Sequence, residues 1–188
     1  MFTLDKYSDI VLKLKEKGVI FDYGMSTKEI IEVEKFYNIS FPIELKQLYS
    51  FGLPVSKGFY NWRDMGVENT QFIKGVLEMP INGLQSDLES EDFWCANWGV
   101  QPDDIEDAQN ILLKHYYNAP KLVPIYSHRY MPFIPENTDI PVFSIMQSDI
   151  IYYGTDLISY LEIEFGFRQY KDIIQADFQH VDFWSDLL

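Results

Sequence analysis

The spacing of apolar residues divides the chain into a helical first part and a strand-rich last third. In three stretches of the first 52 residues, apolar positions recur every three or four residues, which predicts three amphipathic helices. Ser26 and Glu29 predict a capping box at the start of the second helix, because each side chain can bind a free backbone N–H there. Asn38 is predicted to end that helix, and Pro42 suits the first turn of the third.

The first helix is predicted over residues 5–17. A fourth is predicted after Asn69 and is expected to end at Pro80, because a proline inside a helix removes a hydrogen bond and clashes with the preceding turn. Residues 81–90 are then expected to form a strand, and 102–114 a helix whose first acids favour its positive end. The predicted inward-facing residues of the first three helices are Tyr7, Ile10, Val11, Leu14, Ile30, Val33, Phe36, Tyr37, Leu45, Leu48 and Tyr49.

The last third contains four short apolar, aromatic and β-branched segments separated by turn residues, LVPIY, RYMPFI, IPVFSIM and DIIYYG, which predict a β-meander. Pro124, Pro132 and Pro141 indicate edge positions or strand starts. A helix capped by Thr155 and ended by Gly166 follows, and the apolar tail is expected to dock on the domain. The order of elements predicts an α+β fold, a central antiparallel sheet packed with N-terminal and C-terminal helices in a single domain over 1–188.

Negative charge is concentrated in one part of the chain. The formal net charge is −14, and residues 75–113 contain nine acids and no Lys or Arg. An excess of acids disfavours direct binding to nucleic acid, whose phosphates attract basic surfaces, although acidity also serves solubility. The nine acids are Glu78, Asp87, Glu89, Glu91, Asp92, Asp103, Asp104, Glu106 and Asp107.

Few features of the sequence indicate a compartment or a cofactor. The N-terminus lacks a basic segment followed by an apolar run, and no stretch approaches the ~20 apolar residues of a membrane span, so a cytoplasmic protein is expected. The single cysteine, Cys95, excludes an internal disulfide and is predicted to be a small buried hydrophobe. His115, His128 and His180 lack zinc-ligand spacing, so neither a metal nor a cofactor is predicted.

Catalytic motifs are also lacking. The sequence has no nucleophile elbow and no glycine-rich phosphate loop. A Cys–His pair stays open, because such partners meet only in space, but no local motif supports one. The acid pairs Glu91–Asp92 and Asp103–Asp104 are more typical of helix capping and solvation than of glycoside hydrolysis. The expectation is therefore a protein that is not an enzyme.

Three segments place aromatic residues beside charges: FYNWRD (59–64), ESEDFWCANWG (89–99) and IYSHRYMP (125–132). Trp, Tyr and Arg dominate binding energy at protein interfaces, but a tryptophan can equally belong to the core. His128 and Arg129, with Tyr126 or Tyr130, could bind an anion. We favour a hairpin tip at 127–129 that sits at the rim of a binding face.

The phrase STKEIIEVEKFYNISFPIELKQLYSFG resembles the opening of the SUKH superfamily, which includes Smi/Knr-type regulators and bacterial immunity proteins. The resemblance is carried by Ser26, Glu29, Ile39, Phe41, Pro42, Leu45, Leu48 and Gly52, followed in order by FYNWRD, FWCANWG and PVFSIMQSDIIYYG. It covers residues 24–166 most clearly and leaves the N-terminal helix and the tail unassigned. It implies an α+β fold, no catalysis, and binding of a toxin domain, often a nuclease.

The first hypothesis is therefore an immunity protein that neutralises a basic toxin domain by direct binding, as a monomer or weak homodimer. The second is a regulatory or scaffolding module with an endogenous protein partner, and the third, less favoured, is a small-ligand protein or enzyme. No contact with membrane or nucleic acid is expected. The predicted partner-binding residues are Trp62, Arg63, Asp64, Glu89, Glu91, Asp92, Trp94, Trp98, Asp103, Asp104, His128 and Arg129.

Overall fold

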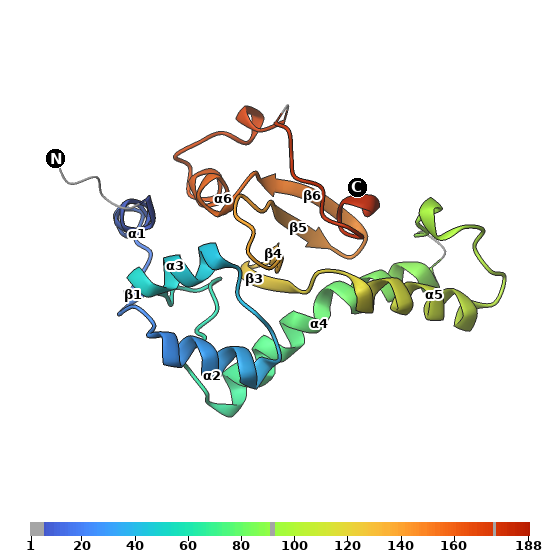
Figure 1. Cartoon of the computed structure of the whole chain (residues 1–188), viewed down its shortest axis with the longest axis horizontal. Helices are drawn as coiled ribbons and strands as arrows, with labels where there is room; N and C mark the ends of the chain where they lie inside the picture. Colours follow the sequence, from blue (N-terminus) through green and yellow to red (C-terminus); the bar gives the residue numbers. More distant parts are fainter. Residues whose placement is uncertain (1–5, 91–92, 175) are drawn as a thin grey trace.

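The computed structural model describes residues 6–90, 93–174 and 176–188 and has the predicted α+β architecture (Figure 1). In this part of the chain, six α-helices accompany a four-stranded antiparallel sheet and a small pair of strands. The helices are α1 (Lys6–Glu16), α2 (Thr27–Tyr37), α3 (Ile43–Phe51), α4 (Val67–Glu89), α5 (Ile105–Asn118) and α6 (Leu157–Glu164). The strands are β1 (Phe21–Asp22), β2 (Leu53–Pro54), β3 (Leu122–Tyr126), β4 (Arg129–Pro132), β5 (Val142–Met146) and β6 (Asp149–Gly154). Three 3₁₀ turns are η1 (Ala96–Trp98), η2 (Tyr170–Asp172) and η3 (Ser185–Leu187).

The predicted meander is confirmed, because the large sheet has the strand order β3-β4-β5-β6 and every pairing is antiparallel. Pro124 lies on β3, an edge strand, where the missing N–H breaks no central ladder. Pro132 is the last residue of β4, and Pro141 directly precedes β5. The three prolines therefore mark an edge, a strand end and a strand start.

The first three helices follow the sequence pattern closely. The Ser26–Glu29 capping box is present, and Asn38 ends α2 in the left-handed conformation with φ 53°. Pro42 precedes α3 as its N-cap, one position earlier than the predicted first turn. The prediction that Phe36 faces inward is wrong, because this residue is 48% exposed whereas its neighbour Tyr37 is buried.

Helix α4 passes through Pro80, so two predictions are wrong: the helix does not end there, and residues 81–89 are helical rather than a strand. A proline at this position leaves the carbonyl four residues earlier, that of Val76, without its helical N–H donor. The buried hydroxyl of Tyr130 on β4 donates to that carbonyl oxygen over 3.1 Å. The sheet therefore supplies the hydrogen bond that the proline removes.

The C-terminal half of α4 contacts the turn between β5 and β6. A Cβ on Gly83 would lie 2.8 Å from Cα of Gln147, so only glycine permits this approach. The Asp87 carboxylate accepts from the Ser148 N–H at 2.9 Å and from the Gln147 side-chain amide at 2.8 Å. These contacts fix the direction in which α4 leaves the sheet.

The C-terminal elements pack onto the same core. Asp156, rather than the predicted Thr155, caps α6 by accepting from the Ser159 N–H. The tail docks as predicted, since Val181 and Trp184 are buried and join the hydrophobic cluster that also contains the buried face of α1.

Candidate functional site

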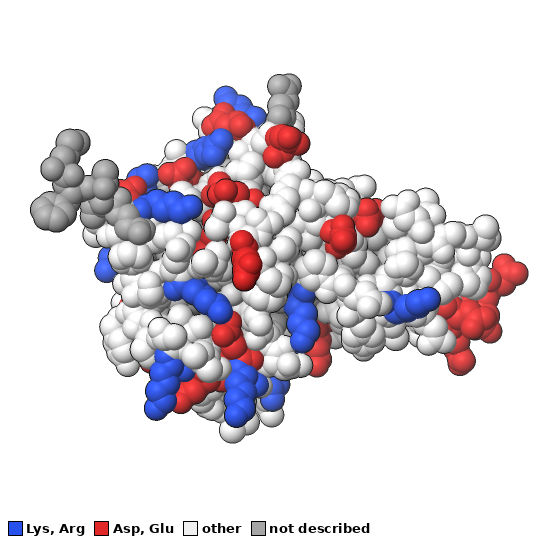
Figure 2. Space-filling model, in the orientation of Figure 1, with Lys and Arg blue, Asp and Glu red and all other residues white. Residues whose placement is uncertain are grey.

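The end of α4, the loop containing η1 and the first part of α5 extend away from the sheet, to the right in Figure 1. We call the described residues 80–90 and 93–113 the acidic lobe. Acidic side chains gather at its tip in Figure 2, whereas the lysines and arginines visible in that view lie mostly over the other end of the molecule. The charge concentration predicted from the sequence is therefore also a concentration in space on this face.

The acids of the lobe differ in the groups to which their carboxylates bind. Asp104 is the N-cap of α5 and accepts from the N–H groups of Glu106 and Asp107 at 2.8 and 3.4 Å. Glu89 accepts a 2.8 Å hydrogen bond from the Gln109 amide, and Asp87 is used by the β5–β6 turn. In the described part of the chain, no acid of the lobe forms an ion pair.

Two of the predicted partner-binding acids, Glu91 and Asp92, lie outside the described residues. Asp103 is exposed and lines a hollow of about 630 Å³ together with Glu89, Pro102 and Ile105. Among the described residues, no Lys or Arg forms an ion pair with Asp103 or Glu89, so this surface presents negative charge to solvent.

Trp94 and Trp98 form the base of the lobe loop. Their rings meet edge to face with centroids 5.3 Å apart, and the Trp94 indole N–H donates to the Gly99 carbonyl at 2.8 Å. Trp98 also stacks on His115 of α5 at 5.3 Å and on Phe183 of the tail at 5.9 Å. Both tryptophans are therefore partly buried, and their packing holds the loop in place.

The loop exposes aliphatic side chains that the sequence analysis missed. Val100 is 94% exposed and Ile105 is 42% exposed, and both lie beside the acids of the lobe. The only signal in the sequence was an isolated valine between Gly99 and the polar Gln101.

The segment Trp62–Asp64 is a different case: the prediction that Trp62 contacts a partner is wrong, whereas Asp64 is exposed and its prediction stays a prediction. Trp62 is fully buried, and its indole N–H donates to the Tyr49 hydroxyl at 3.2 Å. Arg63 binds the carboxylates of Asp22 and Glu29, each at 2.8 Å. The Arg63 guanidinium, with the Ser26 hydrogen bonds, lowers the pKa of Glu29 to about 2.

Asp64 accepts from the Gly66 N–H at 2.8 Å and so shapes the turn before α4. Arg63 joins this turn to β1 and α2, which lie at the opposite end of the long axis from the η1 loop (Figure 1). The structure therefore does not bring the FYNWRD segment together with the lobe.

The predicted hairpin tip is partly right. Ser127, with φ 49°, and His128 form the turn between β3 and β4, but Arg129 is the first residue of β4. Its guanidinium lies 3.3 Å from the Glu164 carboxylate and 4.0 Å from the Tyr153 ring centroid. Arg129 therefore holds α6 to the sheet, which corrects its prediction as a partner contact.

His128 is partly shielded at the turn, and that burial, with the nearby Arg129 charge, lowers its pKa and favours the neutral ring at neutral pH. It lines a separate hollow of about 450 Å³ beside Phe72, Met79 and Met146. Pro80, Asn82 and Gly83 of α4 line the same hollow, so His128 lies beside the start of the lobe rather than beside Asp103 and Glu89.

Within the described residues, no group of three or more His, Cys, Asp or Glu side chains is arranged to hold a metal ion. Cys95 is buried, as predicted. No helix in the described part of the chain combines the length and apolar character needed to cross a bilayer. Comparisons with protein-family models, curated proteins and solved structures found no match.

Proposed function

We propose that this chain is a non-catalytic binding protein whose acidic lobe docks on a basic surface of another protein. One observation carries the proposal: a projecting lobe places acids that form no ion pair among the described residues beside the exposed Val100 and Ile105. Charge of one sign steers a partner of the other sign, and apolar side chains at the centre of a contact supply lasting affinity. The lobe combines both properties.

The resemblance of residues 24–166 to SUKH proteins supports a more specific partner, the toxin domain of a bacterial polymorphic toxin. Toxin nucleases bind phosphates and are therefore basic, which matches the charge of the lobe. On this proposal the chain is an immunity protein, and a regulatory module with an endogenous partner is the alternative outcome of the test.

The test is affinity capture from the native cell, followed by association kinetics at several salt concentrations. In the lobe variant, Asp103→Asn, Glu106→Gln and Asp107→Asn remove three charges from exposed positions. Association should slow about tenfold at low salt and depend less on ionic strength. A matched control, Glu16→Gln, Glu136→Gln and Asp177→Asn, removes the same charge from exposed positions outside the lobe.

Equal slowing in the two variants would show that only net charge matters and would remove the lobe as the docking surface. Recovery of a toxin domain supports the immunity function. A captured partner of endogenous metabolism, still dependent on the lobe, would instead support the regulatory alternative.

A further inference from the structure

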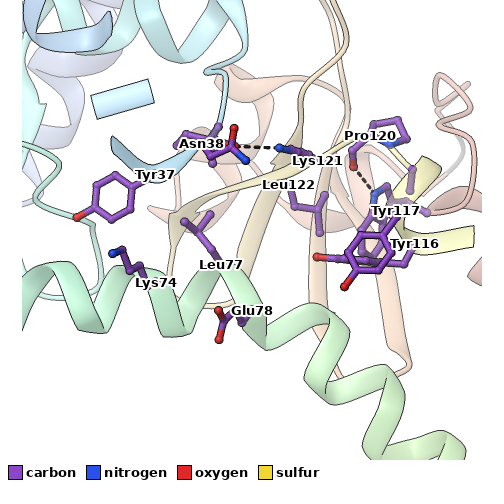
Figure 3. A pocket seen from close by; sticks show the side chains of 13 residues that line it. Tyr37, Asn38, Lys74, Leu77, Glu78, Tyr116, Tyr117, Pro120, Lys121 and Leu122 are labelled. Carbon is purple, nitrogen blue, oxygen red and sulfur yellow. Dashed lines mark hydrogen bonds between the residues drawn. The ribbon is translucent and has the colours of Figure 1, made fainter. Parts of the chain in front are cut away.

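A hollow of about 500 Å³ lies at the base of the acidic lobe, between the end of α2, the middle of α4, the end of α5 and the start of β3 (Figure 3). Its floor is apolar and includes Leu77, Leu122 and Trp184. Its volume is within the range of pockets that hold a small ligand or one large side chain.

The cations on the α2 side of this hollow are engaged within the protein. The Lys121 ammonium donates to the Asn38 carbonyl at 2.9 Å, and the Lys74 ammonium lies 4.9 Å from the Phe36 ring centroid. Lys74 and Glu78 are one helical turn apart on α4, a spacing that commonly produces an ion pair. No such pair forms here, because Lys74 is directed to α2 instead.

The α5 side of the hollow has the opposite character. Tyr116 and Tyr117 line this side with ring centroids 5.8 Å apart, edge to face, and Tyr117 is 77% exposed at the rim (Figure 3). Burial, then the neighbouring Tyr117 and the Glu78 charge, raise the pKa of Tyr116, so its phenol stays neutral at neutral pH. In the part of the chain that the structure describes, neither hydroxyl nor the Glu78 carboxylate has a hydrogen bond.

We infer that this hollow receives a cationic side chain of the partner, an arginine or a lysine, against Glu78, Tyr116 and Tyr117. A carboxylate and phenol oxygens accept hydrogen bonds from a guanidinium or ammonium, and the tyrosine rings attract the cation. The apolar floor accommodates the aliphatic stem of the side chain. The inference rests on the proposed function, since it assigns a position to one basic residue of the proposed partner.

The lysines determine how such a side chain enters. Lys74 and Lys121 repel a cation placed at the α2 side, so the charge must settle at the α5 side. The hollow therefore favours a cationic side chain whose charged end lies at the α5 side. It adjoins the lobe that is proposed to attract the partner.

The test uses a probe that is independent of the partner: Nα-acetyl-arginine amide, titrated into the full chain and followed by NMR. Its neutral isostere, Nα-acetyl-citrulline amide, is the control ligand. Saturable shifts are expected at Tyr116, Tyr117 and Leu122 with the arginine compound and not with the citrulline compound. Glu78→Gln should weaken binding of the arginine compound about tenfold, whereas Glu136→Gln, which removes an exposed acid outside both the lobe and the hollow, should leave its Kd unchanged.

The inference is overturned if the citrulline compound binds equally well, if Glu78→Gln binds like wild type, or if no saturable shifts appear at the hollow. Shifts at Lys74 and Lys121 with Nα-acetyl-glutamate amide alone would reassign the hollow to anions and overturn it too. These failures differ from failure of the proposed function, which appears only in the capture and kinetics of the lobe variant.

Discussion

We call the described residues outside the acidic lobe the body of the molecule. Carboxylates in the body and carboxylates in the acidic lobe differ in the groups that they bind. In the body, acids bind cations on other elements: Glu34 pairs with Lys46 at 2.8 Å, and Glu162 pairs with Lys13 at 3.1 Å. In the described part of the lobe, by contrast, carboxylates bind backbone and amide groups or face solvent. Carboxylates therefore connect secondary-structure elements in the body, whereas in the lobe they give the solvent-facing surface a negative electrostatic potential.

Arg63 shows how far the body uses its charges internally. It donates four hydrogen bonds, to the carboxylates of Glu29 and Asp22 and to the carbonyls of Tyr23 and Gly24. Its guanidinium carbon also lies 3.8 Å from the Tyr23 ring centroid. An arginine so fully engaged has few donors left for a partner.

The largest effect that tests this comparison is expected at Glu44, in the first turn of α3. Its side chain is fully buried, neither oxygen has a hydrogen bond in the described structure, and the Lys6 ammonium is 4.0 Å away. Burial, and then the Asp156 charge, raise its pKa from 4.5 to about 7. The folded state therefore binds more protons than the unfolded state between these values, and stability falls as pH rises through this window.

Glu44→Gln removes that titration. The difference in unfolding free energy between variant and wild type should shift in favour of the variant by about 3 kcal/mol between pH 4 and pH 8. Urea unfolding across this range measures it. Parallel stability curves would mean that Glu44 does not titrate in the window and that the body tolerates a buried charge.

The next effect is expected for Arg63→Met, which keeps the aliphatic bulk and removes the four hydrogen bonds. Unfolding free energy should fall by about 2 kcal/mol, because Asp22 and Glu29 are exposed enough to regain water. The pKa of Glu29 should rise from about 2 toward its ordinary value of 4.5, as seen by carboxyl NMR titration. Arg168→Met is the control, because Arg168 forms no ion pair among the described residues. An equal loss of unfolding free energy in Arg168→Met would mean that the hydrogen bonds of Arg63 do not stabilise the fold.

A smaller effect tests the helix that connects the two regions. Tyr130→Phe should cost about 1–2 kcal/mol, because it leaves the Val76 carbonyl buried without a donor. In a Pro80→Ala background the cost should shrink, since the alanine N–H can bind that carbonyl. A double-mutant cycle should therefore give a coupling of about 1 kcal/mol. Additive costs would refute the link between the two residues.

The smallest effect on stability is expected in the lobe itself. The variant Asp103→Asn, Glu106→Gln and Asp107→Asn should change unfolding free energy by no more than about 0.5 kcal/mol, as is usual for exposed positions. Thermal unfolding measures this. A loss as large as that of Arg63→Met would mean that lobe carboxylates also hold the fold together, and the contrast between the regions would disappear.

Most of what the sequence predicted correctly depends on residues close together in the chain. The Ser26–Glu29 capping box, the αL residue Asn38 and the turns of the meander are set within a few positions. Pro80 failed because its compensating donor, Tyr130, is 50 residues away, a pairing that only the folded structure provides. The fold class was therefore predictable, and the course of α4 was not.

The candidate site also has a part that the local sequence predicts and a part that depends on residues distant in the chain. A run without bases located the lobe, since charge concentration is a property of the local sequence. Whether Trp62, Arg63 and Arg129 face solvent depends on distant partners, and all three have internal ones. An aromatic residue beside a charge has the same appearance in a sequence whether it binds a partner or closes a core.

The stacking of Trp98 between His115 and Phe183 also has a consequence for the order of synthesis. Of the two rings that stack on Trp98, His115 is made 17 positions later and Phe183 is made 85 positions later. Until the tail has been made, Trp98 has its contacts with Trp94 and His115 but not the contact with Phe183. The lobe loop should therefore reach its final packing only after residue 183 has left the ribosome.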